Sequence, residues 1–463
     1  MLTVEFDEKD KRPKYEQLYR HIRDDIASGK MSEGAKLPSK RKLAAHLHIS
    51  LNTIENAYAQ LTAEGFVEPV EKKGYFVLPV VSARRSPPPA APSFATPAKT
   101  PGRKTSRLTL RNNAVDTESF PFASWSRLMR DSLREDHAEL VREQHPQGDR
   151  QLREAIAGYL LEYRNMNVAA DRIVIGAGTS YLLGMLTELV PGRSFAIEDP
   201  GYFMLARTLQ SRGVPFAAVP VDSEGMAVEG LRRSRAAVSV ITPSNQFPLC
   251  RVMSVKRRMQ LLDWAHEANG RYLVEDDYDS DYRYALKPAP ALHGMDWGER
   301  VVYFNTFART LTPSLRIAYM VLPHPLIEAY GKRRQLYSCT VSGFEQRTLW
   351  RFIRDGHYER HLNRMRTIYK RRRNALLEGL APLSGKVGVS GIEAGLHLLL
   401  HSEAGMTEAE MTARAAARDV VVFGLSGFFH QAAPETNTVI AGYGGLSEAE
   451  LRKAAARLCK AWK

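Results

Sequence analysis

The sequence predicts an α/β protein in which a small helical module precedes a much larger body with a mainly parallel sheet. Between residues 15 and 80, three helical patterns are followed by two short strand-like runs. Beyond Leu108, short apolar strands alternate with polar loops and helices, which is typical of a sheet whose functional groups lie at the strand ends. At 463 residues the chain exceeds one ordinary core, which favours two or more domains.

Composition narrows the class of protein. No run of about 18 uncharged apolar residues occurs, and Met1 to Lys30 is charged throughout, so we expect neither a membrane span nor a secretory signal. Cys250, Cys339 and Cys459 are far apart and match no metal or redox spacing, which fits a reducing cytoplasm. The net charge of +14 indicates either a polyanionic partner or a solvated basic surface.

The first eighty residues carry the helical patterns. Leu18, Ile22 and Ile26 recur at helical spacing and predict an amphipathic helix from residue 15 to 26. Ser39 is placed to cap a second helix that runs to Leu47. Ser50 can cap a third, from residue 51 to about 64, and strand-like runs at 66–70 and 75–80 then flank a hairpin tip at 71–74.

Three helices and a hairpin outline a winged helix-turn-helix, whose third helix enters the major groove of DNA. The stretch K-L-P-S-K-R-K-L-A-A-H-L-H-I-S-L-N-T-I-E-N-A-Y-A-Q-L-T-A-E-G-F-V resembles GntR-type regulators. The resemblance implies these DNA-binding residues: Ser39, Arg41, Ser50, Asn52, Thr53, Tyr58, Lys73 and Gly74. The alternative is that the two serines only cap helices, Tyr58 is core and Arg41 is a solvated side chain.

The module departs from the GntR pattern at two positions. The family's turn glycine is His48, which must then accept a positive φ, and the basic residue that usually follows the serine is Leu51. The second change removes an expected DNA contact at the start of the recognition helix. We therefore expect an unusual operator or a modest affinity.

The segment from Val81 to Arg107 separates the module, residues 1–80, from the body, residues 108–463. It is proline-rich and contains six basic residues and no acidic ones. Such a composition predicts an extended, semi-rigid spacer that cannot fold alone. Its charge either adds nonspecific attraction to DNA phosphates or is simply solvated.

Five polar loops follow predicted strands of the body. They are Gly176 to Thr179, Glu198 to Tyr202, Thr242 to Pro248, Glu275 to Tyr278 and the segment after Val301 to Phe304. In this order the loops resemble the MocR group of regulators, in which a GntR-type domain is fused to a fold-type I aminotransferase-like domain. The resemblance covers nearly the whole chain except the linker.

The MocR resemblance implies a pyridoxal phosphate site. Gly178, Thr179, Thr306 and Arg316 would lie at the phosphate, and Tyr202 would stack on the pyridine ring. Asn245 and Tyr278 would approach the phenolic oxygen, and Asp276 would pair with the pyridine nitrogen. The alternatives are ordinary loop roles: a helix-capping loop, a core aromatic, a turn asparagine and a solvated acidic loop.

Arg309 stands where the resemblance implies the lysine that forms a Schiff base with the cofactor. The motif Thr306-x-x-Arg309 is followed seven residues on by Arg316, as in fold-type I enzymes, although Ala318 replaces the usual glycine. A guanidinium stays protonated and offers only donors, so it can hold an anion but cannot condense with an aldehyde. Arg309 could instead pair with a neighbouring acid or fill the cofactor space.

The sequence thus predicts a cytoplasmic regulator that binds operator DNA and senses a small ligand, pyridoxal phosphate or an amino compound, without a Schiff base. We expect no catalytic residues, no metal site and a homodimer, with His397 and His430 as structural residues. One alternative is an active pyridoxal-phosphate aminotransferase with an appended DNA-binding domain. Another is a body that serves only as a dimerisation scaffold.

Overall fold

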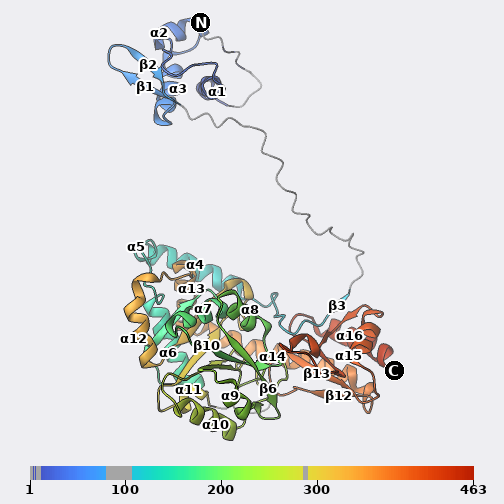
Figure 1. The fold of residues 1–463 in the computed structure, drawn as a ribbon. Helices are drawn as coiled ribbons and strands as arrows, with labels where there is room; N and C mark the ends of the chain where they lie inside the picture. Colours follow the sequence, from blue (N-terminus) through green and yellow to red (C-terminus); the bar gives the residue numbers. More distant parts are fainter. Residues whose placement is uncertain (1–3, 5, 7–11, 80–106, 285–289) are drawn as a thin grey trace. The chain divides into compact units, whose positions relative to one another are not determined.

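The chain divides into two compact units, Met1–Gly102 and Arg103–Lys463, shown in Figure 1. The computed structural model describes residues 4, 6, 12–79, 107–284 and 290–463. The predicted linker, 81–107, therefore lies outside the described residues except for Arg107. Each unit has its own buried core, and each is described separately.

The first unit contains three helices and one hairpin, as predicted. Its elements are α1 (Lys14–Ala27), α2 (Lys40–Leu47), α3 (Leu51–Ala63), β1 (Val67–Val70) and β2 (Gly74–Val77). The helical periodicity of the sequence becomes a core in which Leu18, Ile22, Ile54 and Leu61 are fully buried. The two strands pair antiparallel and form the wing.

Local capping fixes where α2 and α3 begin. The Ser39 hydroxyl accepts a hydrogen bond from the Lys42 N–H at 3.3 Å, and the Ser50 hydroxyl accepts one from Thr53 N–H at 3.2 Å. His48 ends α2 in the left-handed conformation, with φ of 52°. The turn that GntR-type sequences make with glycine is therefore made here by a histidine.

The second unit is built on an eight-stranded, mainly parallel sheet in the order β4-β11-β10-β9-β8-β5-β6-β7. Its strands are β4 (Ile173–Gly176), β11 (Ala318–Val321), β10 (Val301–Thr306), β9 (Tyr272–Asp276), β8 (Val238–Ile241), β5 (Phe195–Asp199), β6 (Phe216–Asp222) and β7 (Gly225–Met226). Five of these strands, β10, β9, β8, β5 and β6, run parallel, while β4, β11 and β7 join through antiparallel pairs. The predicted α/β class is confirmed.

Helices cover both faces of this sheet. One face packs against α7 (Thr179–Leu189), α8 (Phe203–Ser211) and α12 (His324–Arg333). The other packs against α4 (Phe122–Glu135), α6 (Arg150–Arg164), α9 (Val228–Ser234), α10 (Val255–His266), α11 (Leu292–Met295), α13 (Gly343–Arg354) and α14 (His357–Leu380), and a short helix, α5 (His137–Leu140), follows α4. No helix within the described ranges is long and apolar enough to cross a bilayer.

A smaller lobe completes the second unit. Its sheet has the order β12-β13-β16-β15, formed by β12 (Val387–Ser390), β13 (His397–Ser402), β16 (Thr438–Gly442) and β15 (Phe423–Gly424). The helices α15 (Glu408–Ala416) and α16 (Glu448–Trp462) share one core with the second half of α14. The first strand of the body, β3 (Leu108–Thr109), pairs in parallel with β14 (Val420–Val421) of this lobe.

The register of the large sheet gathers the functional loops at one edge. Gly176 lies opposite Ala318, which in turn lies opposite Thr306, so these three residues form a row across β4, β11 and β10. On the other side of β10, Phe304 lies opposite Asp276. The carboxyl ends of the parallel strands therefore meet at this edge, where ligands bind in open α/β sheets.

Candidate functional site

The first unit presents a polar face made by α2, the start of α3 and the wing. Arg41 on α2, Asn52 on α3 and Lys73 on the wing are exposed, and Thr53 is half-buried. Gly74, with φ of 115°, closes the wing turn in a conformation that side chains rarely adopt. These exposed groups can approach DNA phosphates and bases, whereas Ser39 and Ser50 use their hydroxyls as helix caps.

Tyr58 does not belong to that face. Its side chain is fully buried, and its hydroxyl donates to the Pro38 carbonyl oxygen at 2.9 Å. The ring also contacts Tyr75 of the wing edge-on, with centroids 5.1 Å apart. Tyr58 therefore packs in the core, where it connects α3 with the wing and with the segment before α2. It has no exposed surface that could contact DNA.

The second unit brings Asn245, Asp276, Tyr278 and Arg309 together at the carboxyl edge of the large sheet. Asn245 Nδ2 lies 3.4 Å from the Tyr278 hydroxyl, and the Arg309 guanidinium carbon lies 5.5 Å from the centre of the Tyr278 ring. Asn245, Asp276 and Arg309 are 2, 7 and 9% exposed. The run Glu275-Asp276-Asp277, which the sequence also allowed as a solvated loop, is buried because β9 continues through Asp276.

Several polar atoms of this cluster, which is the candidate ligand pocket, have no hydrogen-bond partner among the described residues. They include Asp276 Oδ1, Arg309 Nη1 and Asn245 Oδ1. Leaving such an atom buried and unpaired costs about 1–3 kcal/mol, more when it is charged. A cluster of unpaired donors and acceptors from three different loops is therefore suited to bind a polar ligand.

The main chain of Arg309 is held from two directions. The Tyr282 hydroxyl donates to the Arg309 carbonyl oxygen at 3.2 Å, and His361 Nε2 lies 2.8 Å from the neighbouring Thr310 carbonyl oxygen. The ion pairs among the described residues do not include Arg309, and its Nη1 has no hydrogen-bond partner there. The structure therefore does not show the alternative in which Arg309 forms an ion pair with a neighbouring acid.

Burial shapes the acid–base behaviour of the pocket. It raises the pKa of Asp276 to about 7, helped by the neighbouring carboxylates of Asp277, Asp279 and Glu198 and opposed by Arg309. Burial likewise raises the pKa of Asp279 and of Glu198 to about 7. These carboxyl groups are short of compensating charge, so a cationic or donor group of a ligand would be favoured beside Asp276.

A second group of predicted residues lies where α7 begins. Gly178 has φ of 95° and caps α7, and a Cβ there would collide with Arg316 Nη2. Arg316 also donates to the Ala177 carbonyl oxygen at 3.3 Å, and its side chain is exposed. The first N–H groups of α7, starting at Thr179, have no intrahelical acceptor, so helix end and guanidinium together favour an anion.

Thr306 and Tyr202 lie between these two groups. Thr306 ends β10, where its hydroxyl accepts from the Ala308 N–H at 3.1 Å and donates to Ile317. Tyr202 is partly buried, and burial and Asp276 raise the pKa of its phenol, while Arg309 and Arg316 lower it. Tyr202 is therefore within electrostatic reach of both ends of the site.

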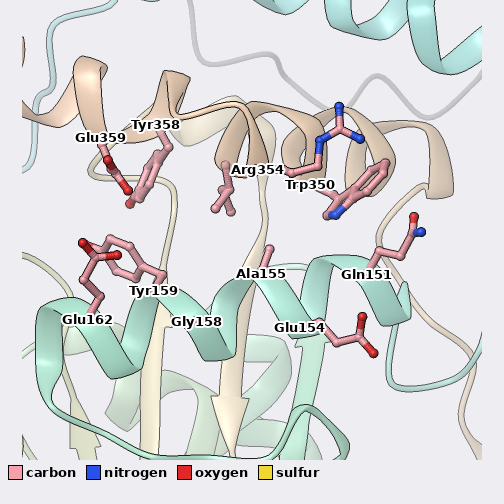
Figure 2. Close-up of a pocket in the computed structure, with 11 residues that line it drawn as sticks. Gln151, Glu154, Ala155, Gly158, Tyr159, Glu162, Trp350, Arg354, Tyr358 and Glu359 are labelled. Carbon is pink, nitrogen blue, oxygen red and sulfur yellow. The ribbon is translucent and has the colours of Figure 1, made fainter.

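A buried network supports the loop that carries Asp276 and Tyr278. Arg164 pairs with Asp277 at 2.8 Å, and the Tyr303 hydroxyl donates to the same carboxylate at 2.6 Å. A separate cavity of about 290 Å³ lies between α6 and the α13–α14 corner, where Figure 2 shows Tyr159 and Tyr358 facing each other. The first tyrosine donates to Asp281 and the second to Thr310, so both stiffen the loops of the pocket.

The comparisons with known proteins cover both units. Residues 14–77 match the family described as bacterial regulatory proteins, gntR family, and residues 107–458 match aminotransferase class I and II. The HTH-type transcriptional regulator YdeL of Bacillus subtilis is 36% identical over 97% of this chain and 97% of its own length. The probable rhizopine catabolism regulatory protein MocR of Rhizobium meliloti is 32% identical over 95% of this chain and 92% of its own. The chain belongs to the MocR group of regulators.

Solved structures agree with the fold of this MocR-type body. The multiple substrate aminotransferase of Thermococcus profundus superposes with a TM-score of 0.69 and 24% identity, over 78% of this chain and 92% of that enzyme. A kynurenine aminotransferase of Pyrococcus horikoshii superposes with a TM-score of 0.69 and 24% identity, over 77% of this chain and 91% of that enzyme. A MocR-type chain is an HTH-type transcriptional regulator that binds DNA through its GntR-type unit and carries an aminotransferase-like body.

Two carboxylates near the site of this MocR-type chain, Asp279 and Glu198, were not among the predicted site residues. Asp279 accepts from Asn245 Nδ2 at 2.8 Å and so occupies one of the amide's donors. Glu198, at the end of β5, is buried behind the pocket and accepts from Thr242 and Gln246. The run of acids E-D-D-Y-D marked the region, but it could not tell which carboxyl group would face inward.

The pocket fits a pyridine phosphate on the evidence of its own atoms. An unpaired, buried Asp276 oxygen suits a protonated ring nitrogen, and the α7 end with Arg316 suits a phosphate. The side chains described above for this pocket include no lysine. The described residues contain no group of three His, Cys, Asp or Glu that could hold a metal, and His397 instead hydrogen-bonds with the Pro248 carbonyl at 2.9 Å.

Proposed function

We propose that this MocR-type regulator controls transcription in response to a pyridoxal-type pyridine phosphate, which its body holds without a covalent bond. The observation that carries the proposal is the pair of unpaired, buried atoms Asp276 Oδ1 and Arg309 Nη1 in one pocket. A carboxylate and a fixed cation that lack partners indicate a ligand with both a donor and an acceptor. A relative that is 28% identical over 94% of this chain bears the name HTH-type pyridoxine biosynthesis transcriptional regulator PdxR, which supports a ligand of the vitamin B6 class.

Each pocket residue has a task in this proposal. Asp276 accepts from the ring nitrogen, Asn245 and Tyr278 bind the phenolic oxygen, and Tyr202 covers the ring. Gly178, Thr179, Thr306 and Arg316 hold the phosphate, which the positive end of α7 attracts. This division of labour supplies orientation and affinity from side chains alone.

Arg309 determines what the pocket cannot do. The aldehyde of pyridoxal phosphate supplies an electrophile that only an unprotonated amine can attack. Arg309 keeps its proton at every accessible pH, so it donates a hydrogen bond and adds positive charge, and no Schiff base forms with it. The site would therefore sense its ligand reversibly.

A homodimer is part of the proposal. Most soluble homo-oligomers have twofold symmetry, and two winged-helix modules then suit an operator with two half-sites. Sedimentation of the full chain at micromolar concentration tests this part. A monomer that still binds its operator tightly would contradict it.

Calorimetric titration of the full chain with pyridoxal phosphate tests the proposed ligand. We expect saturable binding that Asp276→Asn weakens about tenfold or more, because a neutral amide replaces the carboxylate that pairs with the ring nitrogen. Thr208→Ser, at a half-buried position of α8 outside the predicted site residues, is a control that should leave the affinity unchanged. No binding by the wild type would overturn the proposal and favour a body that only dimerises.

The alternative is a working aminotransferase with an appended DNA-binding domain. The solved aminotransferases have the same fold as the second unit. The alternative requires an amine at the position of Arg309. Transfer of an amino group from any of the common amino acids to a keto acid, measured with added pyridoxal phosphate, would support it. We expect no turnover above the background of the free cofactor.

A further inference from the structure

The charge of Arg309 is compensated only at a distance. Its guanidinium carbon lies 5.5 Å from the centre of the Tyr278 ring, and Arg309 takes part in none of the ion pairs among the described residues. Asp276 and Asp279 interact with it electrostatically from farther away. One of its terminal nitrogens is buried without an acceptor among the described residues, so the guanidinium has a donor that the acceptor of a ligand could satisfy.

The pattern of substituents on the ring indicates which part of the ligand meets this donor. This step rests on the proposed function. With the ring nitrogen at Asp276, the phenolic oxygen near Asn245 and Tyr278, and the phosphate arm at Gly178 and Arg316, the ring methyl group and one polar substituent are left, and the polar one is the group that can meet a donor. It lies para to the ring nitrogen, on the side of the ring away from Asp276, and Arg309 supplies the unsatisfied donor beside Tyr278.

We propose that Arg309 makes this pocket select pyridine phosphates that carry an acceptor at that para substituent, an alcohol or an aldehyde, and reject the form that carries an ammonium. An alcohol or aldehyde oxygen accepts from Arg309 Nη1, whereas an ammonium offers only donors and the same sign of charge. A lysine could lose its proton and tolerate the amine, but a guanidinium cannot. The regulator would thus report the alcohol and aldehyde forms of the vitamin and ignore the amine form.

The carboxylate of Asp279 opposes this selection, because it would attract the ammonium that Arg309 repels. Its carboxylate interacts electrostatically with Arg309 and would attract an ammonium beside it, but the carboxylate already accepts a hydrogen bond from Asn245 Nδ2 at 2.8 Å. Burial also raises the pKa of Asp279 to about 7, so near neutral pH the group is charged only part of the time. Arg309 is charged all of the time, which favours rejection of the amine.

A matched pair of ligands tests the proposal on the full chain. Pyridoxine phosphate and pyridoxamine phosphate differ only in a hydroxyl and an ammonium, and neither can condense with a lysine. Calorimetric titration of the wild type should give a dissociation constant about tenfold or more higher for pyridoxamine phosphate, since like charges face each other across the pocket. Equal affinities, or tighter binding of pyridoxamine phosphate, would overturn the selection.

Two variants assign the effect to its cause. Arg309→Gln keeps a donor but removes the charge, and it should bring the two dissociation constants within about threefold of each other. Asp279→Asn should widen the difference, because it removes the carboxylate that favours an ammonium. Undiminished selection in Arg309→Gln would contradict the role of Arg309, while failure of both ligands to bind the wild type would instead contradict the proposed function. The comparison of the two ligands on the wild type needs no variant, so the proposal can still be refuted if a variant fails to fold.

Discussion

Asp276 is a costly residue in the ligand-free protein, and the proposed ligand would offset that cost. Its carboxyl group is almost fully buried, one oxygen has no partner among the described residues, and burial raises its pKa to about 7. A protein keeps such a group at a cost in stability unless a partner arrives to balance it. We interpret Asp276 as the residue that converts ligand binding into relief of this cost.

The cost of Asp276 can be measured through pH. Because its folded pKa lies above the ordinary value of an aspartate, the folded chain holds the extra proton between about pH 4 and pH 7, and the favourable contribution is lost as the pH rises through that window. We expect Asp276→Asn to raise the melting temperature of the ligand-free chain at about pH 8 and to change it little at about pH 5. Tryptophan fluorescence follows the body selectively, since every tryptophan of the chain lies beyond residue 107.

The comparison has to be made between variant and wild type at each pH. Buried histidines such as His293 and His397, whose pKa burial lowers to about 4, contribute with the opposite sign in the same window. Their contribution is common to both proteins and cancels in the difference. An equal change in melting temperature at both pH values would contradict the assignment of a raised pKa to Asp276.

Arg41 and Asn52 are the residues that test how the first unit reads DNA. Arg41→Ala should weaken binding to a selected operator and reduce the slope of log affinity against log salt by about one unit for each lost phosphate contact. Asn52→Ala should narrow the difference between operator and random DNA if Asn52 reaches a base. Fluorescence anisotropy at several salt concentrations measures both.

Arg20→Ala is the matched control for this pair. It removes the same charge from α1, where Arg20 pairs with Glu16 at 3.0 Å. The salt slope should stay at the wild-type value, because α1 lies outside the α2, α3 and wing face. Wild-type binding and specificity in both Arg41→Ala and Asn52→Ala would remove the DNA-contact assignment.

At the scale of elements, the helices and the hairpin of the first unit could be predicted because the sequence patterns that specify them are local. Serine caps, apolar spacing and the Gly-closed hairpin predicted α1 to α3 and the wing to within a few residues. Tyr58 shows the limit of that reading. Its place on the apolar face of α3 predicted a core residue, the family resemblance predicted a contact, and only the packing against Pro38 and Tyr75 decides for the core.

The pairing of β3 with β14 could not be read from the sequence. Leu108 and Val420 lie more than three hundred positions apart, and neither two-residue strand has a periodic pattern. The Leu108 N–H donates to Asp419, and the Leu110 N–H donates to Val421, both at 2.9 Å. The chain that enters the body is therefore anchored to the small lobe, not to the large sheet.

Substitution of Leu110 tests this anchor. Leu110→Pro removes the N–H that bonds Val421, and Leu110→Ala removes the same buried side chain but keeps that N–H. We expect Leu110→Pro to lower the free energy of unfolding of the body by about 1–3 kcal/mol more than Leu110→Ala. Denaturant titration followed by tryptophan fluorescence measures the difference. Equal losses in the two variants would show that the backbone bond contributes nothing.

At the scale of the molecule, two units with separate cores divide the work of a regulator. The first unit exposes the groups that can read DNA, and the second brings five loops of the chain to one sheet edge. The alternation of strands and helices predicted that edge, because parallel strands place their carboxyl ends together. The individual site residues were expected from the MocR resemblance, not from the alternation. The sequence could not predict Asp279 or Glu198, whose orientation depends on where β9 and β5 end, nor the small lobe, which is held together by long-range pairs.

The central claim is that the body binds its pyridine phosphate without a covalent bond. Dialysis, borohydride treatment and mass spectrometry test it together. The full chain and Arg309→Lys are saturated with pyridoxal phosphate, treated with borohydride, digested and analysed by mass spectrometry of the peptide around residue 309. We predict that the wild type binds the ligand, releases it on dialysis and gives an unmodified peptide, whereas Arg309→Lys gives a peptide that retains the ligand. A wild-type chain that retains the ligand in its pocket through a covalent bond, or that binds none before treatment, would contradict the account.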